Sequence, residues 1–221
     1  GLTTAMTGTE VSVEGVVVGD FQNNLLPDDG QLGGFHIQDF PGDGAATTSD
    51  GLFIYYSVSD VSVGDRVRAR GTVAEYNGVT ELTGVSQVWV CSSGNVITST
   101  ALALPVAAIT DFEPFEGMLV TFPQELVISE YFNYDRYGEI VLTSQRQIQP
   151  TAVYTPGSPE QAALAAAHLL DRITLDDGRT TQNPDPAIHP NGEVFTMTNL
   201  FRGGDTVANV TGVIDYSFNL Y

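Results

Sequence analysis

Lysine is absent from the 221-residue sequence, and all eight basic residues are arginines, set against 27 aspartates and glutamates. The formal net charge is −19, so the chain as a whole repels polyanions. Such acidity is typical of a protein kept soluble in a salty or extracellular medium. Clustered carboxylates can alternatively hold calcium or magnesium, so the charge alone leaves both interpretations open.

Cysteine and long apolar runs are also scarce. The single cysteine, Cys91, excludes an internal disulfide. No stretch approaches the roughly 18 apolar residues that a membrane-spanning helix needs, so we expect no membrane contact. The sequence opens at Gly1 without a charged and apolar leader, so we expect any targeting segment to lie upstream or to have been removed.

Short strands separated by turns fill residues 10–90. Alternating or β-branched stretches lie at 11–18, 34–39, 52–56, 67–74 and 85–90, with glycine, aspartate and proline between them. Five short antiparallel strands without a long helix favour an all-β fold. In particular they favour a small Greek-key barrel of the oligonucleotide/oligosaccharide-binding kind, the OB-fold. A fragment of a β-sandwich is the alternative.

Two phrases occur twice in the chain. EGVVV at 14–18 resembles EGMLV at 116–120, and GDRVRARGTVAEY at 64–76 shares five of thirteen residues with GDTVANVTGVIDY at 204–216. We therefore predict two tandem OB-fold-like Greek-key barrels. The first covers residues 1–110, including a trailing linker, and the second covers 111–221.

The second copy is the longer one. The first pair of phrases is 102 residues apart and the second pair is 140 apart, so it carries 38 additional residues between them. Within them Ser158 has the position of a helix N-cap, followed by Pro159 at the first helical position and by Gln161 three residues after the cap. The sequence thus predicts an inserted helix near 159–170.

A basic stripe is predicted on one strand of the first barrel. Arg66, Arg68 and Arg70 alternate, so all three project from the same face of that strand. Such a stripe can clamp phosphates beside bases that stack on outward aromatic side chains. The alternative is a solvated face on which the arginines neutralise nearby carboxylates. The predicted nucleic-acid-binding residues are Arg66, Arg68, Arg70, Tyr55, His36 and Trp89.

The loop at 39–50 is a candidate metal site. Asp39, Asp43 and Asp50 place three carboxylates in a short glycine-rich turn, which is chemistry that calcium or magnesium accepts. The loop lacks the EF-hand spacing, and aspartate and glycine also make ordinary turns. A second acidic group, Asp176, Asp177 and Asp185, has the same two interpretations.

Catalytic motifs are missing. His36, His168, His189 and Cys91 do not have zinc-site spacing. The sequence also contains no phosphate-binding loop, no Gly-x-Ser-x-Gly elbow and no dinucleotide fingerprint. We therefore predict no catalytic residues in this chain.

Eight phrases, spread over nearly the whole chain, resemble the region that precedes the catalytic domain in secreted bacterial nucleases of the ExeM and YhcR type. None is diagnostic alone, but their order and spacing strengthen the resemblance. The phrases are VEGVV at 13–17, GFHIQD at 34–39, TSDGLF at 48–53, VGDRV at 63–67, EGMLVTF at 116–122, RYGE at 136–139, LDDG at 175–178 and QNPDP at 182–186.

The resemblance implies an exported, divalent-cation-dependent DNase. In that family an OB-like region is followed by an endonuclease/exonuclease/phosphatase domain that performs the hydrolysis, and this chain contains no such catalytic set. We therefore expect an extracellular, non-catalytic segment that binds or orients DNA, or the adjacent catalytic domain. A structural, protein-contacting module is the alternative that the acidic surface favours. A carbohydrate-binding barrel is a further alternative, because outward aromatic rings also stack on sugars.

Overall fold

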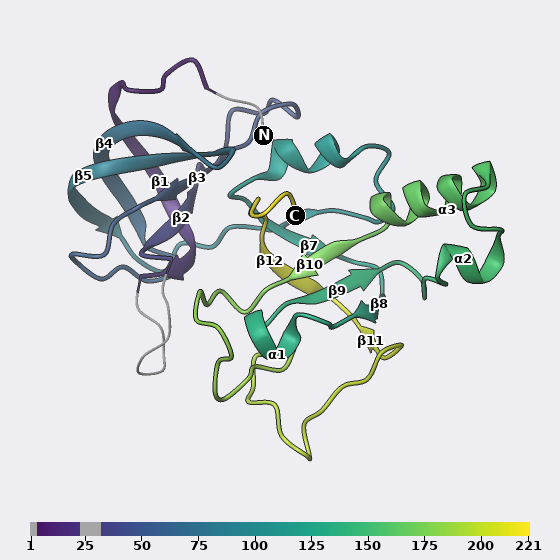
Figure 1. The fold of residues 1–221 in the computed structure, drawn as a ribbon. Helices are drawn as coiled ribbons and strands as arrows, with labels where there is room; N and C mark the ends of the chain where they lie inside the picture. The colour runs from purple at the N-terminus through teal and green to yellow at the C-terminus, as the bar shows by residue number, and fades with distance from the viewer. Residues whose placement is uncertain (1–3, 23–31) are drawn as a thin grey trace.

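A computed structural model describes residues 4–22 and 32–221 and consists mainly of strands (Figure 1). The prediction of an all-β protein is confirmed. The helical segments are short: the 3₁₀-helix η1 (Ile109–Phe115) and the α-helices α1 (Tyr134–Tyr137), α2 (Pro150–Val153) and α3 (Pro159–Leu170). Within the described ranges, no helix is long and apolar enough to cross a membrane.

The first five strands form a closed barrel in the order β1-β2-β3-β5-β4. These strands are β1 (Glu10–Phe21), β2 (Gly34–Gln38), β3 (Gly51–Ile54), β4 (Arg66–Tyr76) and β5 (Val79–Ser92). All neighbours are antiparallel except β3 and β5, which are parallel. Alternate residues point inward, so Val67 and Leu82 are fully buried in the barrel core together with Phe35 and Ile54.

The hairpin between β4 and β5 shows how the local sequence shapes the barrel. Asn77 and Gly78 form its two-residue loop, with φ of 52° and 94°. A type I′ turn needs positive φ at both central residues, and Asn-Gly is the pair that tolerates it best. The turn matches the right-handed twist of its strands, which allows the long β4–β5 ribbon to curve around the barrel.

The second unit is built from two open sheets rather than a second closed barrel. One sheet has the order β10-β9-β8-β11 and the other has the order β12-β7-β6. Their strands are β6 (Thr100–Ala101), β7 (Leu119–Phe122), β8 (Leu126–Glu130), β9 (Ile140–Thr143), β10 (Ile173–Leu175), β11 (Thr206–Val207) and β12 (Val210–Val213). Both sheets pack on one core that contains Phe112, Phe122, Leu126 and Leu142.

Two interruptions explain why this unit does not close. Pro123 follows β7 and has no N–H to continue a ladder, so β7 and β8 are separate strands. Asn209 separates β11 from β12 for a different reason, because its φ of 56° takes the backbone out of the extended conformation. The prediction of two closed barrels is therefore wrong for the second unit, because each of these breaks diverts one continuous ladder into two sheets.

The repeated Gly-Asp-x-Val phrase has the same backbone structure in both units. In the barrel the N–H of Val17 donates to Asp65 O at 2.8 Å, and the N–H of Gly64 donates back to Val17 O at 2.9 Å. The second unit repeats both bonds, at 2.9 and 2.8 Å. A bulge interrupts β8 against β9 one step after these bonds, as it does β1 against β2. The equivalent residues are Val17 and Ile128, Gly64 and Gly204, and Asp65 and Asp205.

The other repeated phrase has no such counterpart. Gly15 lies within β1 opposite Val67. Gly117 instead lies in the turn before β7, with a φ of 75°. The second half of β1 is matched by β8, so the correspondence of 14–18 with 116–120 does not hold in the structure.

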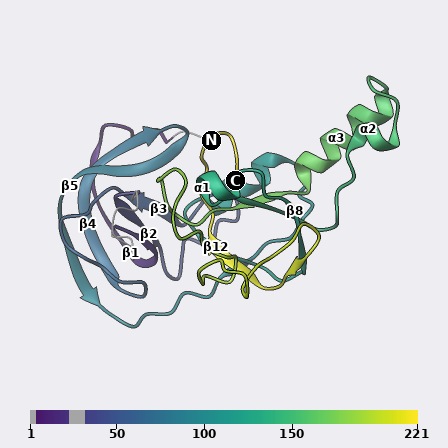
Figure 2. The ribbon, with the colours of Figure 1, turned by 60° about the horizontal axis from the view of Figure 1, so that its bottom comes forward.

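The chain passes from the barrel to the second unit before the predicted boundary. The last barrel strand ends at Ser92, and β6 already pairs with β7. The boundary between the two units therefore lies between Ser92 and Thr100. The predicted boundary, residue 110, falls within η1. The predicted helix 159–170 is present as α3, and Ser158 Oγ accepts a hydrogen bond from the N–H of Gln161 at 3.2 Å. Helices α2 and α3 point away from the barrel (Figure 2).

The second unit covers the outer face of β1, β2 and β3. Gln38 Oε1, on β2, accepts a hydrogen bond from the N–H of Leu119 at 3.0 Å. A Cβ at Gly19 would lie 3.0 Å from Val213 Cγ2, and one at Gly178 would lie 2.9 Å from Phe21 Cε1. As a result every residue of β2 is buried, on both faces of the strand.

Candidate nucleic-acid interface

The predicted basic stripe lies on the open outer face of β4. The side chains of Arg66, Arg68 and Arg70 are 51%, 58% and 54% exposed. Trp89 on β5 lies directly opposite Arg68 and is itself 43% exposed. Residues opposite each other in an antiparallel pair share a face, so four of the six predicted residues gather on one surface. We call this surface, made of these three arginines and Trp89, the β4–β5 face.

Carboxylates from β1 border the β4–β5 face. Glu14 lies opposite Arg68 and accepts a hydrogen bond from its Nε at 2.6 Å, and it also pairs with Arg66 at 3.3 Å. Glu10 pairs with Arg70 at 2.7 Å. Hydrogen bonds from Arg70 and Arg68 lower the pKa of Glu10 and of Glu14, respectively, so both stay ionised. Three positive charges therefore face two negative ones, which leaves this surface weakly positive.

These two glutamates were missed by the sequence interpretation, although a signal exists. Glu10, Ser12 and Glu14 alternate along β1 as the arginines alternate along β4. Antiparallel pairing of the two strands then places the carboxylates beside the guanidinium groups. Only the identity of the neighbouring strand was needed to find them.

His36 does not belong to this interface. It is 3% exposed and lies between the rings of Phe21 and Phe53, at centroid distances of 5.8 and 4.8 Å. Burial lowers the pKa of His36 to about 4, so the imidazole is neutral near pH 7 and brings no charge to a phosphate. Its prediction as a binding residue is wrong, because a buried, neutral imidazole between two phenylalanine rings cannot reach a nucleic acid on the surface.

Tyr55 is exposed but lies away from Trp89. Its N–H donates to Leu82 O beside the early part of β5, and its side chain is 56% exposed. Trp89 lies seven steps beyond Leu82 along β5, a distance of roughly 23 Å at about 3.3 Å per residue. A single nucleotide cannot contact both rings, so Tyr55 can take part only if a longer strand runs along the barrel.

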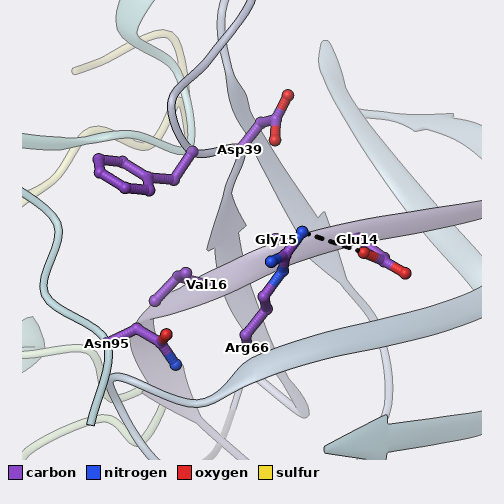
Figure 3. A pocket seen from close by; sticks show the side chains of 7 residues that line it. Glu14, Gly15, Val16, Asp39, Arg66 and Asn95 are labelled. Carbon is purple, nitrogen blue, oxygen red and sulfur yellow. Dashed lines mark hydrogen bonds and ion pairs between the residues drawn. The ribbon is translucent and has the colours of Figure 1, made fainter. Parts of the chain in front are cut away.

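A small crevice lies at one end of the basic stripe (Figure 3). Its volume is about 50 Å³, and the residues around it include Glu14, Asp39, Phe40, Arg66 and Asn95. Arg66 reaches across it toward Glu14, and Asp39 stands on the other side (Figure 3). This volume is far below the roughly 300–1,000 Å³ of a small-molecule site, so the crevice does not enclose a base. Any nucleic acid therefore has to bind on the surface of the β4–β5 face.

Two of the three carboxylates of the acidic loop accept hydrogen bonds from within the loop. Asp50 Oδ1 accepts the N–H of Asp43 at 3.2 Å, and Asp43 Oδ1 accepts the N–H of Ala45 at 2.7 Å. The N–H of Asp39 donates to the backbone oxygen of Asp50 at 2.8 Å. These bonds are those of an ordinary turn. Cation binding by Asp39, Asp43 and Asp50 stays a prediction.

One member of the second acidic group, Asp177, is held in a buried ion pair. Arg179 Nη2 and Asp177 Oδ2 lie 2.6 Å apart, and each of the two side chains is 5% exposed. The guanidinium of Arg179 also donates to Pro186 O. Asp176 is a separate buried carboxyl whose pKa rises to about 6, mainly through burial. In the described parts of the chain, no three His, Cys, Asp or Glu side chains are arranged to hold a metal ion.

The comparisons with known proteins identify one family. The family described as "Domain of unknown function (DUF8508)" matches residues 86–221, which begin inside β5 and include the whole second unit. No curated protein and no solved structure matches the chain. Since the family covers more than half of the sequence, the chain belongs to the DUF8508 family.

Proposed function

We propose that this chain is a non-catalytic, OB-like segment of an exported DNase and that it holds DNA on the β4–β5 face. The observation that carries the proposal is the placement of exposed Trp89 opposite Arg68, with Arg66 and Arg70 on either side. An OB-like assignment is supported by the strand order β1-β2-β3-β5-β4 and by the parallel β3–β5 pair. The exported parent enzyme, its cation dependence and the neighbouring catalytic domain are parts of the same proposal.

Single-stranded DNA suits this surface better than duplex DNA. Trp89 offers a ring on which one base can stack, and stacking on an aromatic side chain contributes about 1–3 kcal/mol per base. The arginines supply phosphate contacts on either side of that ring. Glu10 and Glu14 compete for the same guanidinium groups, and the charge of −19 repels the strand. We therefore expect weak binding that depends strongly on salt and improves with a divalent cation.

The sole tryptophan gives a direct test of this surface. Fluorescence of Trp89 is recorded while oligothymidylate is added, at several salt concentrations, with and without Mg²⁺. Stacking is expected to quench the fluorescence. The triple variant Arg66→Gln, Arg68→Gln, Arg70→Gln should bind more weakly and with a flatter salt dependence, because fewer counterions are released.

A control triple variant removes the same charge elsewhere. Arg136→Gln, Arg146→Gln and Arg202→Gln all lie in the second unit and should leave DNA binding unchanged. Equal loss in both triple variants would mean that net charge alone governs binding. Quenching that is unaffected by the β4 substitutions would overturn the assignment of the β4–β5 face.

A protein-contacting module is the second candidate. The ion pairs of Glu10 and Glu14 with the arginines favour it, because they already satisfy most of the positive charge without a nucleic acid. The same titration decides between the two candidates. No quenching at the lowest salt concentration, with or without Mg²⁺, would favour the protein-contacting module.

A further inference from the structure

The second unit contains a larger cavity than the barrel. Its volume is about 420 Å³, and it lies between the strands β8 and β9 and the inserted segment with α2 and α3. Glu130 of β8 and Val141 of β9 line it from the sheet, and Gln147, Gln149 and Arg172 line it from the insertion. We call this cavity the insertion groove. Its size falls in the range of about 300–1,000 Å³ that is usual for small-molecule sites.

The groove occupies a defined position in the repeat. Glu130 faces Val141 directly after the bulge in β8, as Gly19 faces His36 directly after the bulge in β1. In the barrel this face is closed by the second unit, through Val213 at Gly19. In the second unit the same face is open, because the chain between β9 and β10 leads into helices that stand away from the sheet (Figures 1 and 2).

Charge in the groove is balanced. Glu130 and Arg172 lie 3.9 Å apart, and the other polar side chains from the insertion include the amides of Gln147 and Gln149. Gln147 Nε2 donates to His168 O at 3.1 Å and to Asp171 O at 2.9 Å, which fixes that amide in place. A polyanion would face Glu130 as well as the net charge of the chain, so a nucleic acid does not suit this site.

The mouth of the groove is apolar. Phe132 is 85% exposed and Ile148 is 59% exposed, and both line the groove. Large exposed apolar side chains beside fixed polar groups are typical of a surface that receives a ligand. An added peptide strand does not fit, because β8 is already paired with β9 and β11, and β9 with β8 and β10.

We propose that the insertion groove binds a neutral oligosaccharide. A pyranose ring has an apolar C–H face, which matches the ring of Phe132, and an edge of hydroxyl groups. Hydroxyls both donate and accept, so they can bond to the amides of Gln147 and Gln149 and to the Glu130–Arg172 pair together. This site is separate from the DNA-binding surface proposed on the barrel, and neither depends on the other.

Calorimetric titration of the full chain tests the proposal. The probes are the neutral oligosaccharides cellopentaose, mannopentaose, maltopentaose and chitopentaose, and a pentamer of galacturonic acid serves as the acidic comparison. We expect saturable heat with at least one neutral probe and none with the acidic one. Binding should weaken at least tenfold in Phe132→Ala and in Gln149→Ala.

A matched control removes another exposed phenylalanine of the second unit. Phe218 is 91% exposed and does not line the groove, so Phe218→Ala should bind as the unsubstituted chain does. Circular dichroism confirms that each variant is folded. The proposal is overturned if no neutral probe gives saturable heat, if Phe132→Ala binds normally, or if the acidic probe binds more tightly than the neutral ones.

Discussion

Replacement of Glu116 by glutamine should make the protein more stable at alkaline pH. Glu116 lies where the second unit meets the barrel, and its backbone oxygen accepts a hydrogen bond from Ser49 Oγ at 2.5 Å. Burial raises the pKa of its carboxyl from 4.5 to about 7, and the neighbouring carboxylates of Glu113 and Asp215 add to this effect. A bond from the N–H of Thr80 opposes the shift, and Oε2 is buried without a hydrogen-bond partner.

The size of the effect follows from the two pKa values. The folded protein binds this proton more tightly than the unfolded chain, so the stabilisation is complete below pH 4.5 and is lost as the pH rises through about 7. The folded and unfolded pKa values differ by about 2.5, and a pKa difference of one corresponds to about 1.36 kcal/mol, so the ceiling is about 3.4 kcal/mol. The carboxyl is partly exposed, and solvent screening reduces this figure to about 1–2 kcal/mol.

Urea unfolding at pH 5 and at pH 8, followed by circular dichroism, measures the effect. Glu116→Gln should raise the unfolding free energy by about 1–2 kcal/mol at pH 8 and change it little at pH 5. Some pH dependence should remain, because burial also raises the pKa values of Asp176 and Asp215. Glu193→Gln, at an exposed loop position, is the control and should have no effect at either pH. Equal stability of Glu116→Gln and the unsubstituted chain at pH 8 would refute the reasoning.

Three further outcomes follow from the fold. Gly204→Ala should lower the unfolding free energy by about 1–2 kcal/mol because φ is 94° there, whereas Gly212→Ala, at an uncrowded strand position, should change it by less than about 0.5 kcal/mol in the same urea experiment. Asp177→Asn should cost about 3 kcal/mol, because it leaves the buried charge of Arg179 without its carboxylate, and a smaller loss would mean that water reaches the pair. The sequence predicts a cation at Asp39, Asp43 and Asp50, so calcium added to EDTA-treated protein should raise the melting temperature saturably; an unchanged melting temperature would mean that the backbone N–H groups already bonded to the carboxylates of Asp43 and Asp50 leave no cation site there.

Local signals in the sequence predicted local structure well. The alternation of Arg66, Arg68 and Arg70 placed them on one open face, because the side-chain period of a strand is two whatever surrounds it. The start of α3 was predictable from Ser158 for a similar reason. The hydroxyl of this N-cap accepts a hydrogen bond from the N–H of Gln161, three residues along the chain. The Gly-Asp turn recurred because glycine at φ near 90° is the cheapest way to make it, at Gly64 as at Gly204.

Properties that depend on distant neighbours were not predictable in this way. His36 alternates with core residues as a surface residue would, but the rings of Phe21 on β1 and Phe53 on β3 lie against it and it is buried. The prediction that the second unit is a closed barrel was wrong for a related reason. The pattern of apolar residues continues past Pro123, but the hydrogen-bond ladder ends there. The partners Glu10 and Glu14 required knowledge of which strand lies beside β4.

The close approach of the barrel to the second unit at Gly51 and Gly117 links two positions 66 residues apart. A Cβ at Gly51 would lie 2.3 Å from the carbonyl carbon of Gly117, so here main chain touches main chain. Enlarging either residue would push the units apart, and no change at the opposite position could make room, since glycine is already the smallest residue. A chimaera that joins this barrel to the second half of a relative would therefore keep the arrangement only if both glycines were retained.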